Sequence, residues 1–405
     1  MREKNARPER SGQPAATDFP SDPMRHRRRS SALWCGAFVS AVLVCTATSA
    51  SAGAGTISLG SDGDAGTLSF GGLLQPRLDY DRQPDGDHQA NAGLRRAWLD
   101  IVGELPGYGI TFRMQTDVSG SASVRDLWLQ YAIGEAWALR MGQYTVPFAV
   151  SRSIGGPNRT FTEIGVAANQ FQVPQGRDAG LGLLGGDPEG RWEASINVFD
   201  GRGRLDSRGD RPATDGGLVT TRAAFAPLGH VPAHTSTLGD TRQPGALSFG
   251  VGAMAASQNH LRDWSFGEAD DDHTEDERAD WAAGTVDVTA SLGPVTGTAA
   301  VFQRRVSPDQ GAGYDDQGWE AELALALPGV NQEIALRRSE LRRDVSDDRP
   351  DAEDRGGQRE WSAGWNAYHD GHARKTQVFA LRTRGSGHPS DASDWQAHMQ
   401  HQLRF

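Results

Sequence analysis

The sequence of 405 residues is poor in two residue types, cysteine and lysine. Its only cysteines, Cys35 and Cys45, lie in an apolar stretch near the N-terminus, so the chain beyond residue 52 has none. Disulfides, thiolate catalysis and cysteine-based zinc sites are therefore excluded from that part. Only Lys4 and Lys375 among the 41 basic residues are lysines. Nucleotide composition bias can cause this excess of arginine, but the planar guanidinium also binds oxyanions bidentately.

The sequence also lacks an apolar run of the ~20 residues that a spanning helix requires, which excludes a helical membrane bundle. Its 50 glycines follow no G-X-Y period, so a collagen-like chain is excluded as well. Aromatic residues (11 Trp, 14 Phe and 6 Tyr) are spread along the chain, which argues against disorder. A mean hydropathy of -0.55 with abundant glycine suits a β-rich protein whose strands give half of their side chains to water.

Residues 24–52 have the pattern of a secretory signal peptide. Arginines at positions 25, 27, 28 and 29 precede an apolar stretch over 32–44, and Ala50-Ser51-Ala52 follows as a small-residue cleavage site. The preceding residues 1–23 are either a polar extension or the result of a start codon assigned before Met24. We therefore expect an N-terminal extension and signal peptide over 1–52 and one domain over 53–405. That domain has 33 basic and 48 acidic residues, a net charge of -15.

Beyond residue 52, apolar and polar residues alternate in segments of about ten residues that Gly, Pro, Asp and Asn separate. In one such segment Trp361, Ala363, Trp365 and Ala367 share a face. Period two over this length predicts β-strands. We expect sixteen of them, at about 65–81, 94–106, 109–118, 123–133, 136–145, 177–186, 191–200, 215–227, 245–257, 279–291, 293–306, 317–328, 331–344, 357–370, 372–384 and 393–405.

The predicted connections alternate in length. Tight turns are expected at 107–108, 134–135, 293–294, 329–330 and 371, and long polar connections at 82–93, 146–176, 201–214, 258–278, 307–316 and 345–356. Short turns at one end and long loops at the other, with an even number of strands, are typical of an outer-membrane barrel. The predicted fold class is all-β, a transmembrane antiparallel β-barrel of about 16 strands.

A secreted β-sandwich binding module is the alternative that the same strand pattern leaves open. The last predicted strand argues against it, because its apolar face ends at Phe405, the final residue. An alternating strand with a C-terminal aromatic residue is the signal that the outer-membrane barrel assembly machinery reads, and a soluble module has no need for it.

The order of segments resembles the phosphate-selective porin O and P family of Gram-negative outer membranes. The likeness is clearest over about 70–200 and again in the tail. Its motifs are Gly71-Gly72-Leu73-Leu74-Gln75, the stretch Leu94 to Glu104, Val124 to Tyr131, Leu139 to Tyr144, Pro147-Phe148, and Pro174 to Leu181. The resemblance implies a water-filled channel for passive diffusion of small hydrophilic solutes, with anions such as phosphate as candidates. It also implies a homotrimer and an inward-folding loop over 146–176.

Two departures from the family pattern bear on phosphate. Val146 stands where the family usually has Glu before Pro-Phe, and Thr162-Glu163-Ile164 replaces a Met-Glu-Arg-like stretch. Phosphate-selective members line the pore with a lysine cluster and an arginine ladder, whereas the domain over 53–405 has the single lysine Lys375. The resemblance therefore supports a porin better than it supports phosphate as the solute.

Alternation also predicts which side chains face the lumen. Leucines at 99, 127, 139, 323 and 325 should face lipid, and their charged neighbours should line water. The loop 146–176 is locally cationic, since Glu163 is its only acid, and its apolar residues can pack on the inner wall. The candidate pore-lining and selectivity residues are Arg96, Arg113, Arg140, Arg152, Arg159 and Arg177.

We find no catalytic constellation and predict no enzyme, cofactor or metal site, although an outer-membrane β-barrel hydrolase stays the alternative from another class. His230 and His234 lie in a loop, and His398 and His401 fall on opposite faces of a strand. The acidic run 270–277 lacks the spacing of a calcium loop. The expected partners are outer-membrane lipid, lipopolysaccharide, small hydrophilic or anionic solutes and the assembly machinery, without nucleic acid.

Overall fold

The computed structural model describes residues 55–59, 66–82, 88–173, 176–205, 216–236, 238, 245–260, 278–309, 313–344, 357–385 and 393–405. Its strands are β1 (Gly55–Leu59), β2 (Gly66–Arg82), β3 (His88–Leu105), β4 (Ile110–Asp117), β5 (Ser123–Ile133), β6 (Trp137–Thr145), β7 (Arg177–Gly186), β8 (Trp192–Phe199), β9 (Leu218–Leu228), β10 (Gly245–His260), β11 (Arg278–Leu292), β12 (Val295–Pro308), β13 (Tyr314–Ala326), β14 (Gln332–Asp344), β15 (Gln358–Asp370), β16 (Arg374–Gly385) and β17 (Ser393–Arg404). Short helical turns are η2 (Pro106–Tyr108), α2 (Val150–Ser153), η3 (Gly156–Asn158) and α3 (Val166–Gln170).

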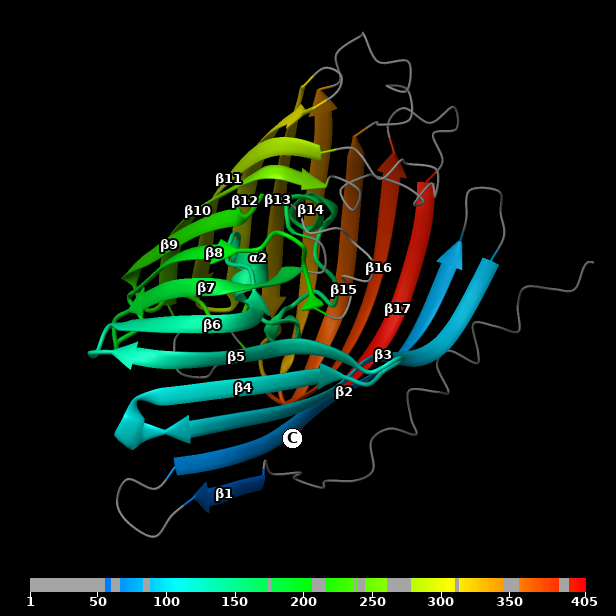
Figure 1. The fold of residues 1–405 in the computed structure, drawn as a ribbon. Helices are drawn as coiled ribbons and strands as arrows, with labels where there is room; N and C mark the ends of the chain where they lie inside the picture. Colours follow the sequence, from blue (N-terminus) through cyan, green and yellow to red (C-terminus); the bar gives the residue numbers. More distant parts are fainter. Residues whose placement is uncertain are drawn as a thin grey trace, which may run out of the picture. The chain divides into compact units, whose positions relative to one another are not determined.

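The strands β2 to β17 form a closed antiparallel barrel of sixteen strands, as the sequence predicts. Each strand pairs with the next along the chain, and β17 pairs back with β2 from Trp395↔Arg82 to Arg404↔Leu73. Figure 1 shows the strands as a ring with α2 inside it. Closure leaves no unpaired strand edge among the sixteen, which an antiparallel sheet in lipid requires.

The C-terminal residue extends the closing seam between β17 and β2. The backbone N–H of Gly72 donates to the carbonyl of Phe405 at 2.8 Å, and the N–H of Phe405 donates back to Gly72 at 3.1 Å. An added Cβ at Gly72 would lie 2.5 Å from the Phe405 ring, so the seam requires glycine there. Strand β1, which the sequence analysis did not predict, continues the line of β17 by pairing with β2 from Gly55↔Phe70 to Leu59↔Gly66.

Two connections differ from the predicted pattern. The hairpin of β2 and β3 continues through the predicted loop, because residues 88–93 pair with β2 although their side chains do not alternate. The connection between β9 and β10 (residues 229–244) joins strands at the short-turn end but is long. The acidic run 270–277 lies outside the described residues.

Side-chain facing follows the predicted alternation. Leu99, Leu139 and Leu323 point outward with 38 to 54% of their surface exposed. The inward residues Arg304 and Glu320 expose 2% or less, because the loop 146–176 covers them. The register of β13 and β14 pairs apolar outward residues with each other, as in Leu323↔Leu336. A slip of one residue would exchange the two faces, so this alternation fixes the register.

Cysteine labelling tests the register. Arg113→Cys and Arg140→Cys should react with a membrane-impermeant thiol reagent in intact outer membranes, because both positions line the water-accessible cavity. The matched variants Phe112→Cys and Leu139→Cys, one residue away, should be shielded by lipid. The domain over 53–405 has no cysteine to compete. Equal labelling of all four variants would mean that the register is wrong.

Candidate functional site

The loop 146–176 lies inside the barrel and is anchored there by aromatic side chains. Phe148 and Phe171 pack against Phe302 of β12, with ring centroids 6.4 and 5.3 Å apart. Phe161 packs against Phe379 of β16 at 5.0 Å. These phenylalanines are almost fully buried. The apolar residues of the loop therefore pack on the inner wall, as the sequence predicts.

Wall side chains of the later strands hold the loop through its backbone carbonyls. The Lys375 ammonium donates to the carbonyl of Arg159 at 2.7 Å, and the Arg337 guanidinium donates to that of Glu163 at 2.7 Å. Further donors are Arg222 to Phe148, Arg304 to Gln170, Asn366 and Gln377 to Thr160, and Gln402 to Pro157, at 2.9 to 3.3 Å. The only lysine of the domain is thus fully buried and supports the loop.

Wall carboxylates bind the loop as well. Asp287 accepts from the backbone N–H of Val150 at 3.1 Å, and Glu360 accepts from that of Val166 at 3.2 Å. Both carboxylates are also paired with arginines, Arg222 and Arg337. Buried carboxylates must be paired to be tolerated. Part of the acidic charge of β11 to β15 is therefore used in fixing the loop.

A second inward segment comes from the short-turn end, within the connection between β9 and β10. The N–H of Thr160 donates to the hydroxyl of Thr235 at 2.7 Å, and the Thr160 hydroxyl donates to the Thr235 carbonyl at 2.9 Å. Ser236 donates to Glu333 at 2.6 Å. This contact could not be predicted from the sequence, because a Pro/Gly/Thr-rich segment gives no sign of its partner.

A cavity of about 970 Å³ remains beside the loop, along β2 to β9, and all six candidate arginines line it. Three further arginines, Arg125, Arg222 and Arg404, join them there. The acidic lining residues are Asp100, Asp126 and Glu193. Nine arginines against three acidic side chains make this described part of the lumen strongly cationic, although the domain as a whole is acidic.

Two of the six candidates are neutralised by carboxylates. The Nε of Arg113 donates to Asp100 at 2.8 Å, and the Nε of Arg177 donates to Asp126 at 2.9 Å. Such charge-assisted pairs are strong where they are partly desolvated. Arg113 and Arg177 therefore offer less net charge to a passing solute than the sequence alone suggests.

The other candidates carry the excess charge. Within the described residues, no carboxylate lies within 4.0 Å of Arg140, Arg152 or Arg159, and Arg96 reaches Glu163 only at that limit. Arg140 is held by Gln130, at 2.7 and 3.0 Å, and by the ring of Trp128, 4.3 Å from its Cζ. Neutral partners orient this guanidinium without cancelling its charge.

The two loop arginines stay charged although they are desolvated. Burial, reinforced by the neighbouring arginines Arg159, Arg177 and Arg96, lowers the pKa of Arg152 to about 9. Burial lowers the pKa of Arg159 to about 10, and nearby glutamates oppose the shift. Both values lie above neutral pH, so the loop presents two cations to the cavity.

Strict alternation misses two inward arginines because each sits in a β-bulge. In β3, Arg96 pairs with Gln75 and Leu94 pairs with Pro76, which leaves Arg95 as an extra residue. In β5, Arg125 is the extra residue between Asp126 and Val124. A bulge re-aims a side chain, so consecutive residues can both face inward. Consecutive charged residues in a predicted strand, Arg95-Arg96 and Arg125-Asp126, are the signal that could reveal it.

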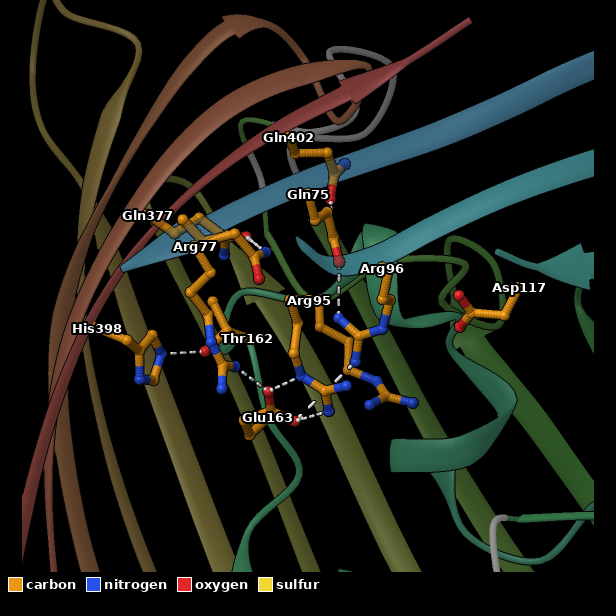
Figure 2. Close-up of polar contacts among 12 residues, drawn as sticks. Gln75, Arg77, Arg95, Arg96, Asp117, Thr162, Glu163, Gln377, His398 and Gln402 are labelled. Carbon is orange, nitrogen blue, oxygen red and sulfur yellow. Dashed lines mark hydrogen bonds and ion pairs between the residues drawn. The ribbon is translucent and has the colours of Figure 1, made fainter. Parts of the chain in front are cut away.

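Glu163, the acid of the loop, is held by arginines of β2 and β3 (Figure 2). Arg77 donates to it at 2.5 Å and Arg95 at 2.7 and 2.8 Å. Although burial opposes the shift, the hydrogen bond from Arg95 and the charges of Arg95, Arg96 and Arg77 lower the pKa of Glu163 to about 2. The carboxylate is therefore ionised at neutral pH and ties the loop to β2 and β3.

The variant Glu163→Gln tests this tie. It removes the anion that neutralises Arg77 and Arg95, so we expect a stronger anion preference and noisier single-channel current as the loop loosens. The matched control Glu189→Gln, at an exposed turn beside Arg191, should leave both unchanged. Because the folded pKa is depressed, the tie is complete above the usual glutamate pKa of ~4.3 and is lost as the pH falls toward 2. Wild-type noise in Glu163→Gln would contradict the proposed anchor.

Comparison with known families matches residues 73–305 to the phosphate-selective porin O and P family model. This match covers more than half of the sequence. The chain belongs to this family. The match reaches through the middle of the chain, beyond the 70–200 range in which the sequence motifs are clearest. Family and fold indicate a channel of the outer membrane rather than an enzyme.

Solved structures of similar fold are porins and channels. An anion-selective porin from Comamonas acidovorans has 12% identity and a TM-score of 0.55, covering 84% of this chain and 100% of that one. The trimer form of OmpT from Vibrio cholerae (10%, TM-score 0.56) covers 84% and 100%. The outer-membrane channel DcaP of Acinetobacter baumannii (10%, TM-score 0.55) covers 86% and 100%. At these identities the likeness establishes the fold. No curated protein sequence matches the chain.

Two features are absent from the described residues. No group of three or more His, Cys, Asp and Glu side chains among them could hold a metal ion. In the same part of the chain, no helix is long and apolar enough to cross a membrane.

Proposed function

We propose that the protein is an outer-membrane porin through which small hydrophilic solutes diffuse passively, with a preference for anions. The observation that carries the preference is the excess of nine arginines over three acidic side chains around the cavity. Charge of one sign along a confined, water-filled passage raises the local concentration of the opposite ion. Membership in a porin family, and the similar fold of an anion-selective porin, support the same function.

The unequal distribution of charged residues between the two sides of the barrel explains how an acidic protein can prefer anions. The carboxylates Asp287 and Glu360 bind the loop backbone on the β11 to β15 side and are paired with arginines. On the β2 to β9 side, Arg140 and the loop arginines Arg152 and Arg159 face the cavity. A solute in the cavity therefore meets mainly guanidinium groups.

We propose small anions in general as the solutes, with phosphate as one of them. Guanidinium groups accept carboxylates and phosphates alike through paired hydrogen bonds. The burial of Lys375 under the Arg159 carbonyl means that this lysine cannot take part in a lysine cluster in the lumen. Nothing in the cavity lining distinguishes phosphate from another small oxyanion.

The remaining partners are proposed with this function. Residues 24–52 would direct export, and the strand ending at Phe405 would be read by the barrel assembly machinery. We propose a homotrimer, which the trimer form of OmpT supports by its similar fold. Crosslinking in intact outer membranes should give a ladder that ends at three protomers. A ladder that stops at the monomer would contradict the trimer while leaving the channel untouched.

Liposome swelling tests the channel itself. Proteoliposomes should swell in iso-osmotic solutions of small neutral sugars, at rates that fall as the sugar grows, because a water-filled passage sieves by size. Small anions should enter faster than cations of equal size. Absence of swelling, with turnover of an ester or glycoside by the same preparation, would favour the outer-membrane hydrolase instead.

A further inference from the structure

The outer face of β14 to β17 changes character abruptly along the strands. Near the short-turn end, the residues that pair across the four strands are apolar: Ile334, Trp365, Val378 and Met399. Closer to the long loops, another row runs Arg338, Trp361, Arg382 and Trp395 across the same four strands. Trp361 and Trp395 expose 59 and 44% of their surface. On the described outer face of β14 to β17, cations and indoles therefore alternate near the long loops, whereas the row near the short turns is apolar.

The arginines of this face are pre-organised by a carboxylate. Glu340, itself 6% exposed, binds Arg338 at 3.1 Å, Arg342 at 2.9 Å and Arg359 at 3.4 Å. The side chains of Arg342 and Arg359 nevertheless expose 72 and 58% of their surface. One carboxylate cannot neutralise three guanidinium groups. In the described part of this face, Glu340 thus aligns the arginines and leaves an excess of positive charge.

The two tryptophans support the arginine row. The Cζ of Arg338 lies 4.8 Å from the ring centre of Trp361, and that of Arg382 lies 5.2 Å from the ring of Trp395. Stacking on an indole fixes the plane of a guanidinium while its edge stays available to an oxyanion. In a membrane barrel, aromatic residues of this kind mark the level of the lipid headgroups.

An apolar groove of about 430 Å³ leads away from this row on the outer surface of β11 to β15. Small residues, Ala290, Gly297, Ala299 and Ala321, form its floor, while Leu323 and Leu336 form part of its walls. Arg338 and Trp361 border the same groove. A hydrocarbon chain lying in the groove would therefore bring its headgroup to the arginines.

We propose that the outer face of β14 to β17 binds the phosphorylated headgroup of the glycolipid of the outer leaflet, with one acyl chain in the groove. The long loops lie at this end of the strands, and in outer-membrane barrels that end is extracellular. Arginine on a lipid-facing surface is costly unless it reaches a partner, and the phosphates of the outer leaflet supply one. This site lies outside the pore and does not depend on its selectivity.

Native mass spectrometry of the full barrel in detergent tests the site. The probe is bisphosphorylated lipid A, compared with its dephosphorylated form. The double variant Arg342→Gln/Arg359→Gln should bind the phosphorylated form about tenfold more weakly, as expected for loss of a charge-assisted hydrogen bond. The control Arg305→Gln, at an outward arginine that is 75% exposed and paired with Asp315, should bind like wild type.

The heat-modifiable gel mobility of each variant shows whether its barrel is folded. If the double variant does not fold, the single variant Arg342→Gln, at the most exposed of these arginines, replaces it in the binding measurement. Equal binding of the phosphorylated and dephosphorylated lipids by wild type would overturn the proposal. So would unchanged binding by the folded variant, or displacement of the lipid by inorganic phosphate alone. Conversion of an oligomer to monomers by the same substitutions would show that the face contacts a second copy, and would also overturn it.

Discussion

Replacing Arg140, Arg152 and Arg159 with glutamate should abolish the anion preference of the channel. These three line the cavity without a carboxylate partner within 4.0 Å among the described residues. The substitutions change the lining side chains from nine arginines and three acids to six of each, so their net charge falls from six to zero. The remaining Arg113, Arg177 and Arg222 are already paired with aspartates. The reversal potential in a KCl gradient should therefore no longer show a preference for chloride over potassium.

Two control variants separate charge from shape. Arg140→Gln/Arg152→Gln/Arg159→Gln removes the charges with a smaller change in polarity, so it should give an intermediate reversal potential. Arg191→Glu/Arg305→Glu alters two arginines that are 60 and 75% exposed, one in the turn between β7 and β8 and one on the outer face of β12. Charges farther from the pore than about 8 Å are screened at physiological salt, so this control should keep the wild-type value. Wild-type selectivity in the glutamate triple variant would exclude these arginines as its source.

Removing Phe405 should block most of the assembly into the outer membrane. The residue ends the closing β17–β2 ladder with two backbone hydrogen bonds to Gly72, at 2.8 and 3.1 Å, and its ring covers that glycine. Without this pair the last strand ends short of β1, and the proposed assembly signal is lost. We expect little heat-modifiable barrel and an accumulation of unfolded protein in the periplasm, measured by gel mobility and cell fractionation.

Gly72→Leu should have a similar, smaller effect from the other side of the seam. A Cβ there would lie 2.5 Å from the Phe405 ring and 2.9 Å from the Trp98 carbonyl, so the strands must separate. Gly93→Leu is the matched control in a neighbouring strand, because nothing lies within 4 Å of a Cβ at that glycine. If the truncated protein and Gly72→Leu both assemble like wild type, the contact between Phe405 and Gly72 is not required for closure of the barrel.

The barrel could be predicted from the sequence because the alternation of apolar and polar residues is visible within each strand. Residues such as Glu320, Glu322, Leu323 and Leu325 alternate between water and lipid, and that alternation sets strand, facing and register together. The entry of the loop 146–176 into the lumen was implied by the resemblance to the porin family, and its apolar residues suit packing on the inner wall. The pairing of β1 with β2 was not predicted, because five residues are too few to show a period.

The arginines of the candidate site could be predicted from the sequence, but their ion pairs with carboxylates could not. All six arginines line one cavity, yet the charges of Arg113 and Arg177 are largely cancelled by aspartates that come from other strands. Alternation tells which side chains share a face, whereas an ion pair depends on rotamers and distances across strands. Arg95 and Arg125 were missed for a related reason, since a bulge breaks the period on which the prediction rests.

The reversal potential of the wild-type channel tests the central claim most directly. A planar bilayer containing the purified protein separates two KCl solutions of different concentration at neutral pH, and the zero-current voltage gives the ratio of chloride to potassium permeability. Because arginines line the cavity, we expect a zero-current voltage whose sign shows that chloride is more permeant than potassium. This voltage should become smaller at high salt, because the arginine charges are screened. A zero-current voltage of the opposite sign would contradict the proposed function.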